Sequence, residues 1–141
     1  MLLFFDVETT GLPRRRSASY KDVDNWPRIV SISWALYGSD EFLVEHRYAV
    51  VRPDGFTIPV DSTRVHGITT EYARTHGQLL IEVLNELEGD VEHYKPSLLG
   101  GLRSKRFAGR DATCPAPKCG LWYTYILYNA GDCGFLQATQ L

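Results

Sequence analysis

The chain has 141 residues, of which 44% are hydrophobic and 23% charged, and its formal net charge is −2. This length is typical of one domain that buries its core without disulfides or metals. The weak negative charge argues against a large electrostatic footprint on duplex DNA, but not against a protein that grips a few nucleotides. No segment reaches the roughly 18–20 apolar residues of a membrane span, and an odd number of cysteines, three, suits a reducing cytoplasm. We therefore expect a cytoplasmic protein with no membrane partner.

The first predicted element is a strand at residues 2–7, and two carboxylates stand at its end. The residues around them are apolar: Leu2, Leu3, Phe4, Phe5 and Val7. Such a run is typical of a strand buried on both faces. Because side chains alternate along a strand, Asp6 and Glu8 should project from the same side. Ionised carboxylates at a buried position are costly unless they are paired or bind a metal, so the pair suits a hard cation such as Mg²⁺; a solvated strand face is the alternative.

Two more strands are predicted after a polar loop. Residues 13–25 are polar and basic, include the run Arg14–Arg16 and have no hydrophobic period, so we expect a loop. A charge run of this kind is usually solvated, with contact to nucleic-acid phosphates as the alternative. Residues 29–37 and 41–51 alternate between apolar and polar side chains, as half-buried strands do. The three strands together predict an antiparallel meander.

Short helical turns are predicted next. Asp61 or Ser62 is expected to cap a turn that reaches towards His66. Thr69 or Thr70 is expected to cap the following turn.

A longer helix and a short strand complete this part of the chain. From Gln78, apolar residues recur at helical spacing at positions 80, 84, 87 and 91, which predicts an amphipathic helix that ends near Gly89 or one turn later. Pro96 forbids further continuation. Residues 97–99 then fit the start of a strand parallel to the first.

Three stretches of the sequence carry a family resemblance. They read Asp-Val-Glu-Thr-Thr-Gly-Leu at 6–12, Asp-Val-Asp-Asn-Trp-Pro-Arg-Ile-Val at 22–30 and Val-His-Gly-Ile-Thr at 65–69. In this order, the three resemble the DEDD 3′–5′ exonucleases, the proofreading-subunit-like branch of the ribonuclease H-like superfamily. The resemblance covers residues 1–99. It implies an α/β fold whose mixed sheet is an antiparallel three-strand meander followed by a helix and a parallel strand.

The resemblance also implies an activity and a set of site residues. It implies metal-dependent 3′–5′ hydrolysis of phosphodiester bonds, with Asp6 bridging two Mg²⁺ or Mn²⁺ ions and Glu8 binding the ion that activates water. The residues expected to contact the terminal nucleotide are Thr9, Thr10, Gly11, Leu12, Val65 and His66. For His66, fixing its own loop by a hydrogen bond is an equal alternative. The substrates would be single-stranded 3′ ends of DNA or RNA, with a polymerase or repair protein as a conceivable partner, and the oligomeric state is open.

The resemblance stops after Leu99. Related enzymes continue into a His-Asn-x-x-Phe-Asp-like motif with the third acid, and later into a His-x₄-Asp element with the general base and the fourth acid. This chain instead reads Gly-Gly-Leu-Arg-Ser-Lys-Arg-Phe at 100–107, has no histidine after His93 and has no glutamate after Glu92. We therefore divide the chain into an exonuclease-like portion, 1–99, and an atypical tail, 100–141, in which the C-terminal part of the fold is incomplete or divergent.

Two alternatives for the function follow from this division. Two acids alone bind Mg²⁺ loosely, because the ion keeps several waters and needs substrate phosphates to complete its shell. The chain is then either an exonuclease, weak or inactive as written, or a catalytically impaired nucleic-acid-binding remnant of one. A ribonuclease H-like scaffold for protein interaction is the third interpretation.

The abrupt change after Leu99 favours a shifted or truncated reading frame over a minimised domain. If the frame shifts near codon 99, one of the other two frames of the coding DNA should encode the missing His-Asn-x-x-Phe-Asp-like motif. Translating both frames past this point is the check, and absence of the motif from both would rule out the shift.

Overall fold

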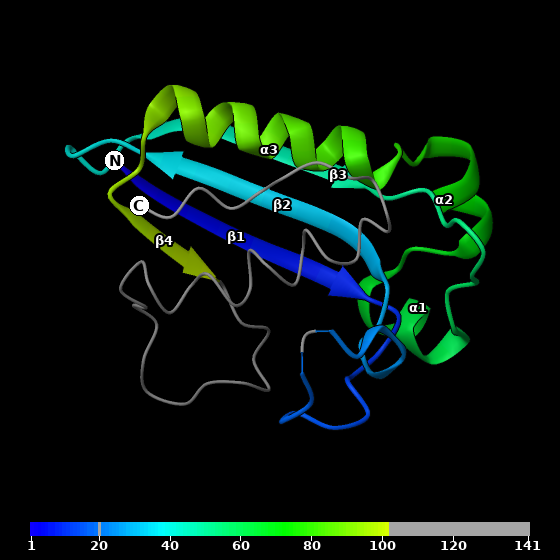
Figure 1. Cartoon of the computed structure of the whole chain (residues 1–141). Coiled ribbons are helices and arrows are strands. Elements are labelled where there is room, and N and C mark those ends of the chain that lie inside the picture. Colours follow the sequence, from blue (N-terminus) through cyan, green and yellow to red (C-terminus); the bar gives the residue numbers. More distant parts are fainter. Residues whose placement is uncertain (20, 102–141) are drawn as a thin grey trace.

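The computed structural model describes residues 1–19 and 21–101, which form a four-stranded sheet with helices on one face and at one end (Figure 1). The strands are β1 (Leu2–Thr9), β2 (Ile29–Tyr37), β3 (Leu43–Val50) and β4 (Leu98–Gly101). Their order across the sheet is β3-β2-β1-β4; β1, β2 and β3 pair antiparallel, and β4 runs parallel to β1. The predicted meander and the parallel strand are confirmed, whereas the predicted atypical tail from 102 onward lies outside the described residues.

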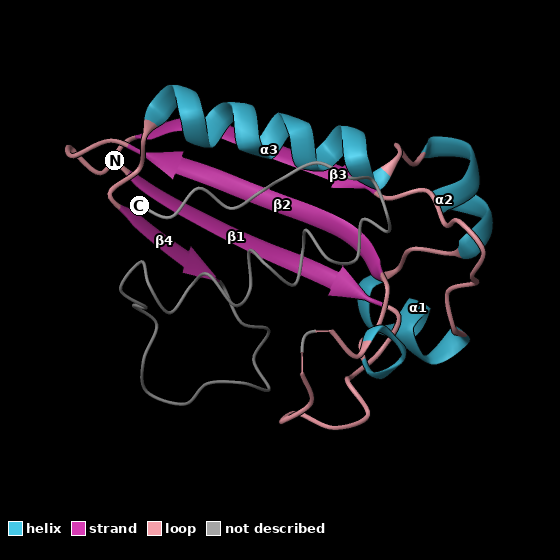
Figure 2. Ribbon diagram, in the orientation of Figure 1, coloured by secondary structure: helices cyan, strands magenta, loops and turns pink. Residues whose placement is uncertain are grey.

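The long helix α3 (Leu80–Tyr94) lies along one face of the sheet (Figure 2). Its buried side chains Val83, Leu84 and Leu87 belong to the same apolar cluster as Leu3 of β1 and Trp34 of β2. The 3.6-residue period places such positions on one side of a helix, and this side meets the alternate positions of the strands. The packing of α3 therefore decides which face of each strand is covered.

The ends of α3 show why the helix continues to the later of its two predicted ends, about one turn beyond Gly89. The carboxylate of Glu82 accepts a hydrogen bond from the backbone N–H of Leu79 at 3.1 Å, which satisfies one of the free donors at the N-terminus. Gly89 is an exposed position inside the helix and does not end it. The helix ends at Lys95, which adopts a left-handed conformation with φ 46° directly before Pro96. None of the helices in the described part of the chain is long and apolar enough to span a membrane.

A polar contact joins α3 to the sheet at the edge of the core. The indole N–H of Trp34 donates to the carboxylate of Asp90 at 2.8 Å. The guanidinium of Arg47 on β3 approaches the same carboxylate oxygen at 3.1 Å. The side chain of Asp90 is 13% exposed, so both partners satisfy a charge that would be costly to leave unpaired there. This contact orients α3 across β2 and β3.

Two short helices, α1 (Val60–His66) and α2 (Thr70–His76), close the end of the sheet where β2 begins and β3 ends (Figure 1). A second apolar cluster forms here from Ala73 of α2, Ile58 and Ile68 on either side of α1, and Val30 and Val50 of the sheet. Thr69 caps α2 as predicted, since its hydroxyl accepts a hydrogen bond from the backbone N–H of Tyr72.

The predicted cap of α1 at Asp61 or Ser62 is wrong. The helix begins at Val60 after Pro59, which occupies the cap position in an extended conformation. Asp61 lies in the first turn instead, where an acidic side chain faces the positive end of the helix dipole.

The prediction that β1 is buried on both faces is also wrong within the described residues. Leu3 is 1% exposed and, with Phe5 and Val7, packs on the side of α3. Phe4 and the acids point to the opposite face and are only partly buried. The apolar run reflects a strand in the interior of a sheet, with helix cover on one side.

Removing a side chain from the α3 interface should destabilise the fold. Leu87→Ala is expected to lower the free energy of unfolding by about 2–5 kcal/mol, because Leu87 is 3% exposed and its loss leaves a cavity. Leu12→Ala is the matched control, as Leu12 is 71% exposed and should change stability by less than about 0.5 kcal/mol. Urea unfolding followed by circular dichroism measures both; equal effects would contradict the packing.

Candidate functional site

Asp6 and Glu8 lie on the face of β1 that α3 leaves uncovered. In the antiparallel register Asp6 stands opposite Ser33 and Glu8 opposite Ser31 on β2. Both acids are partly buried. Phe5, which precedes Asp6, and Val7, which lies between the two acids, pack on the α3 side. Alternation along the strand therefore places both carboxylates on the opposite side. As part of a rigid strand, the two acidic groups therefore have fixed positions.

The environment of Asp6 disfavours its negative charge. Partial burial raises the pKa of the Asp6 carboxyl above its ordinary value, and the nearby charge of Glu8 raises it further, while a hydrogen bond from the backbone N–H of Val7 acts in the opposite direction. Burial and a neighbouring like charge both penalise an ionised carboxylate. A cation shared by the two acids would relieve this penalty.

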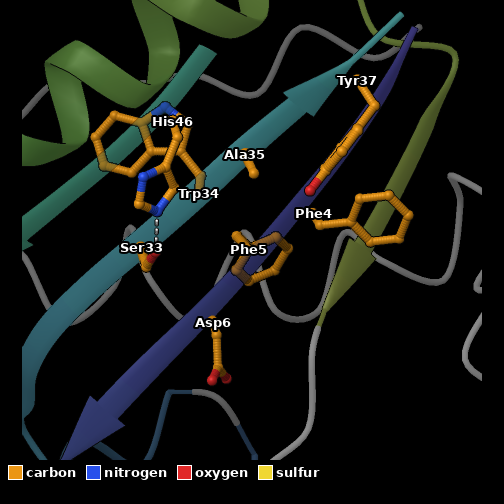
Figure 3. Close-up of a pocket in the computed structure, with 8 residues that line it drawn as sticks. All are labelled: Phe4, Phe5, Asp6, Ser33, Trp34, Ala35, Tyr37 and His46. Atoms are coloured by element: carbon orange, nitrogen blue, oxygen red, sulfur yellow. Dashed lines mark hydrogen bonds between the residues drawn. The ribbon is translucent and has the colours of Figure 1, made fainter. Parts of the chain in front are cut away.

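A pocket of about 420 Å³ opens on the same face, with Asp6 at one end and Tyr37 at the other (Figure 3). Its lining comes from β1, β2 and β3: Phe4, Phe5, Asp6, Ser33, Trp34, Ala35, Tyr37 and His46. Ser33 and His46 are joined by a hydrogen bond of 3.3 Å between Oγ and Nε2. Neither was expected from the sequence, because the register that sets Ser33 opposite Asp6 and His46 opposite Ala35 exists only once the sheet has formed.

The residues after the acids mainly satisfy the end of the strand. The Thr9 hydroxyl donates to the carbonyl of Gly11 at 2.8 Å. Thr10 binds Arg28 twice, since its backbone N–H donates to the Arg28 carbonyl and its hydroxyl accepts from the Arg28 N–H, each at 2.9 Å. Leu12, at 71% exposed, is the side chain of this predicted set that is available to a ligand.

The predicted His66 element forms a fixed loop at the same end of the sheet. The Nδ1 atom of His66 accepts a hydrogen bond from the backbone N–H of Ile68 at 3.1 Å. Ile68 in turn packs in the apolar cluster with Val30, one residue beyond the Ile29 that pairs with Thr9. The loop-fixing role of His66 is therefore present. Val65, in contrast, has a side chain that is 79% exposed.

The second ring nitrogen of His66, Nε2, differs from Nδ1 in its hydrogen bonding. Because Nδ1 accepts a hydrogen bond, the proton of the neutral ring resides on Nε2. That atom is buried and has no hydrogen-bond partner in the part of the chain that the structure describes. It is therefore a buried donor that no described group satisfies.

Asn25 is a buried polar residue that the sequence analysis did not single out. It is 5% exposed, and its amide oxygen and nitrogen bind the backbone N–H and carbonyl of Arg15 at 2.8 and 2.9 Å. Its own carbonyl accepts from the N–H of Arg14 at 3.0 Å. Its position in the stretch 22–30, which resembles the family, was the available signal.

Asp6 and Glu8 can supply only part of a metal site. Carboxylate oxygens suit Mg²⁺ and Mn²⁺, and the penalised charge of Asp6 fits a cation. Among residues 1–19 and 21–101, however, no group of three or more His, Cys, Asp or Glu side chains could hold a metal ion. β4 reaches Gly101 opposite Phe5 and carries no acid. The pair is a half-site.

No protein-family model matches the sequence, and no curated protein matches it either. The fold does have solved counterparts. A structure of Escherichia coli Exonuclease I in complex with a 5cy-dA13 oligonucleotide superposes with a TM-score of 0.57 at 19% identity, over 75% of this chain and 21% of that chain. A product-bound exonuclease I gives 0.57 at 19% identity, over 75% and 22%, and Exonuclease I from Methylocaldum szegediense gives 0.55 at 16%, over 75% and 21%.

The described chain has a ribonuclease H-like fold. The predicted fold class is thereby confirmed, including the meander, the helix and the parallel strand. The chain spans about a fifth of the length of the Exonuclease I chains that it matches (21–22%). At this level of identity the likeness establishes the fold.

The turn after α1 should depend on a glycine. Gly67 has φ 80°, a left-handed conformation, and a Cβ there would meet nothing within 4 Å. Gly67→Ala should therefore cost only the backbone strain, about 1–2 kcal/mol of unfolding free energy. Gly67→Asn should cost less, because asparagine tolerates this conformation. Thermal unfolding of the two variants measures the difference, and an alanine variant as stable as the parent would contradict it.

Proposed function

We propose that residues 1–99 are the front half of a metal-dependent 3′–5′ exonuclease that hydrolyses phosphodiester bonds at single-stranded 3′ ends. The observation that carries the proposal is the placement of Asp6 and Glu8 on the face of the first strand opposite α3, in a ribonuclease H-like sheet. The Ile68 that binds His66 packs with Val30 of β2, the strand that pairs with β1, and with Val50 of β3. Two structures with this fold are of Exonuclease I bound to oligonucleotides, which supports single-stranded DNA as the first substrate to test.

The described side chains take distinct roles in this proposal. Asp6 and Glu8 bind Mg²⁺ or Mn²⁺, which supplies an activated water and neutralises charge at the scissile phosphate. Leu12 presents an exposed apolar surface on which a terminal base or sugar can pack. The Nε2–H of His66 donates to a polar group of the terminal nucleotide. Thr9 and Thr10 act through the backbone, since their hydroxyls hold the strand end in place.

A second candidate function is nucleic-acid binding without cleavage. The observation that favours it is the half-site, because no third acid joins Asp6 and Glu8 among residues 1–19 and 21–101. Two carboxylates leave most positions around Mg²⁺ to water and substrate oxygens. The tail, 100–141, is then a segment without the later catalytic residues of the family.

Cleavage of a 5′-labelled single-stranded oligonucleotide separates these functions. With Mg²⁺ or Mn²⁺, the unsubstituted chain should produce a ladder that shortens from the 3′ end. Asp6→Asn and Glu8→Gln should each lower the rate by more than about 100-fold, since even the outer-shell partners of metal ligands typically contribute 10–100-fold. Asp54→Asn, which removes one charge from an exposed turn, is the matched control and should cleave normally.

The fold of the Asp6 variant must be checked in the same series. Asp6→Asn should not lower the thermal midpoint, because it removes a carboxylate whose charge is disfavoured by burial. Binding without cleavage by the unsubstituted chain would replace the exonuclease with the binding function. Neither binding nor cleavage would leave only the protein-interaction scaffold. The same assay with an RNA of equal sequence decides between DNA and RNA.

A further inference from the structure

The basic turn, defined as Arg14, Arg15 and Arg16, is held in place by a buried side chain. Three hydrogen bonds of 2.8–3.0 Å run between Asn25 and the backbone of Arg14 and Arg15. Asn25 itself is 5% exposed, and burial of an amide is tolerated only when its donors and acceptors are paired. A merely solvated charge run has no need of such an anchor. The anchor fixes the backbone and leaves the guanidinium groups outside.

The basic turn consists of exposed residues on a chain that is acidic overall. Arg14, Arg15 and Arg16 are all exposed, while the formal net charge of the chain is −2. Arg15 forms an ion pair with Asp22 at 3.5 Å, in which its side chain stays 75% exposed. A surface pair of this kind is worth less than about 1 kcal/mol, so a phosphate can compete for Arg15. The basic turn is therefore a local positive patch.

The patch is tied to the strand that carries the acid pair. The two hydrogen bonds between Thr10 and Arg28 close the base of the loop two residues beyond Glu8. The basic turn begins six positions after Glu8 in the sequence. Asp6 and Glu8 repel phosphates, whereas the basic turn attracts them, and the two lie at the same end of β1.

We propose that the basic turn binds backbone phosphates of a single-stranded nucleic acid whose 3′ end reaches Asp6 and Glu8. The inference rests on the proposed function. It adds a second contact, which holds the nucleic-acid strand beyond its terminal nucleotide. Asn25 preorganises the turn, so that binding orders little additional backbone. Asp22 weakens the attraction of the patch for phosphates because it forms an ion pair with Arg15. The chemical group that the basic turn recognises is the repeating backbone phosphate, so the recognition is independent of base sequence.

Binding of a fluorescein-labelled single-stranded dT16 by the full chain, in EDTA so that no strand is cleaved, tests the proposal. Arg14→Gln/Arg15→Gln should weaken binding by on the order of tenfold at low salt and reduce the slope of log K against log salt by about 1.4, given about 0.7 per phosphate contact on single strands. Both side chains are exposed and their bonds to Asn25 use the backbone, so the variant should keep its melting temperature.

Two further variants make the test specific. Arg74→Gln/Lys95→Gln removes the same charge from α2 and the end of α3, where both residues are exposed, and should leave affinity and slope nearly unchanged. Asp22→Asn should bind several-fold more tightly, because it releases Arg15 and removes a charge that repels phosphate.

The outcomes distinguish this inference from the proposed function. A basic-turn variant with the affinity and salt slope of the unsubstituted chain would overturn the phosphate contact, while binding and cleavage by the unsubstituted chain would keep the exonuclease. An Asp22→Asn variant that binds no more tightly, or a control double variant that loses as much affinity as the basic-turn variant, would also overturn it. Absence of any binding by the unsubstituted chain in EDTA would overturn the phosphate contact, whereas the exonuclease would be overturned only by absence of cleavage with Mg²⁺ or Mn²⁺.

Discussion

The packing of α3 on one face of the sheet is the constraint on which the other features depend. Leu87 and its apolar neighbours on α3 meet Leu3 of β1 and Trp34 of β2 in one cluster. Because strand side chains alternate, covering these positions sends Asp6 and Glu8 to the opposite face. The same contact that supplies most of the core therefore positions the acid pair where a cation and a phosphate can reach it. A shift of one residue in the register of β1 would bury both carboxylates under the helix.

Two largely buried polar side chains, Asp90 and Asn25, fix orientations that apolar packing alone does not specify. Asp90 holds Trp34 and Arg47 together at the edge of the core, and Asn25 holds the basic turn beside the strand end. Apolar contacts are not directional, whereas a buried hydrogen bond is satisfied in few geometries. The first contact sets the placement of the helix on the sheet, and the second gives a polar loop one backbone conformation. The second contact lies in the loop that closes at the end of β1, where Thr10 binds Arg28.

The candidate site combines two acids on a rigid strand with a fixed loop around His66. The acids stand on a strand in the interior of the sheet, and His66 is held by the backbone of Ile68, which is itself buried. Preorganised groups of this kind lose little freedom when a ligand binds. The donor set is hard and incomplete in the described residues, so substrate oxygens would have to contribute to any bound Mg²⁺.

The sequence by itself determined the elements whose pattern repeats over many residues. The alternation of 29–37, the helical period from Gln78 and the cap at Thr69 are local signals, and each corresponds to the element in the structure. The pairing of the two acids on one side of β1 follows from local alternation as well. The identity of the covered face of β1, the opposition of Ser33 to Asp6, the contact of His46 with Ser33 and the bond of Asn25 to the basic turn were decided only by the tertiary structure. The physical reason is that these contacts join residues at least 10 positions apart. Their meeting depends on strand register and helix packing and leaves no period in the chain.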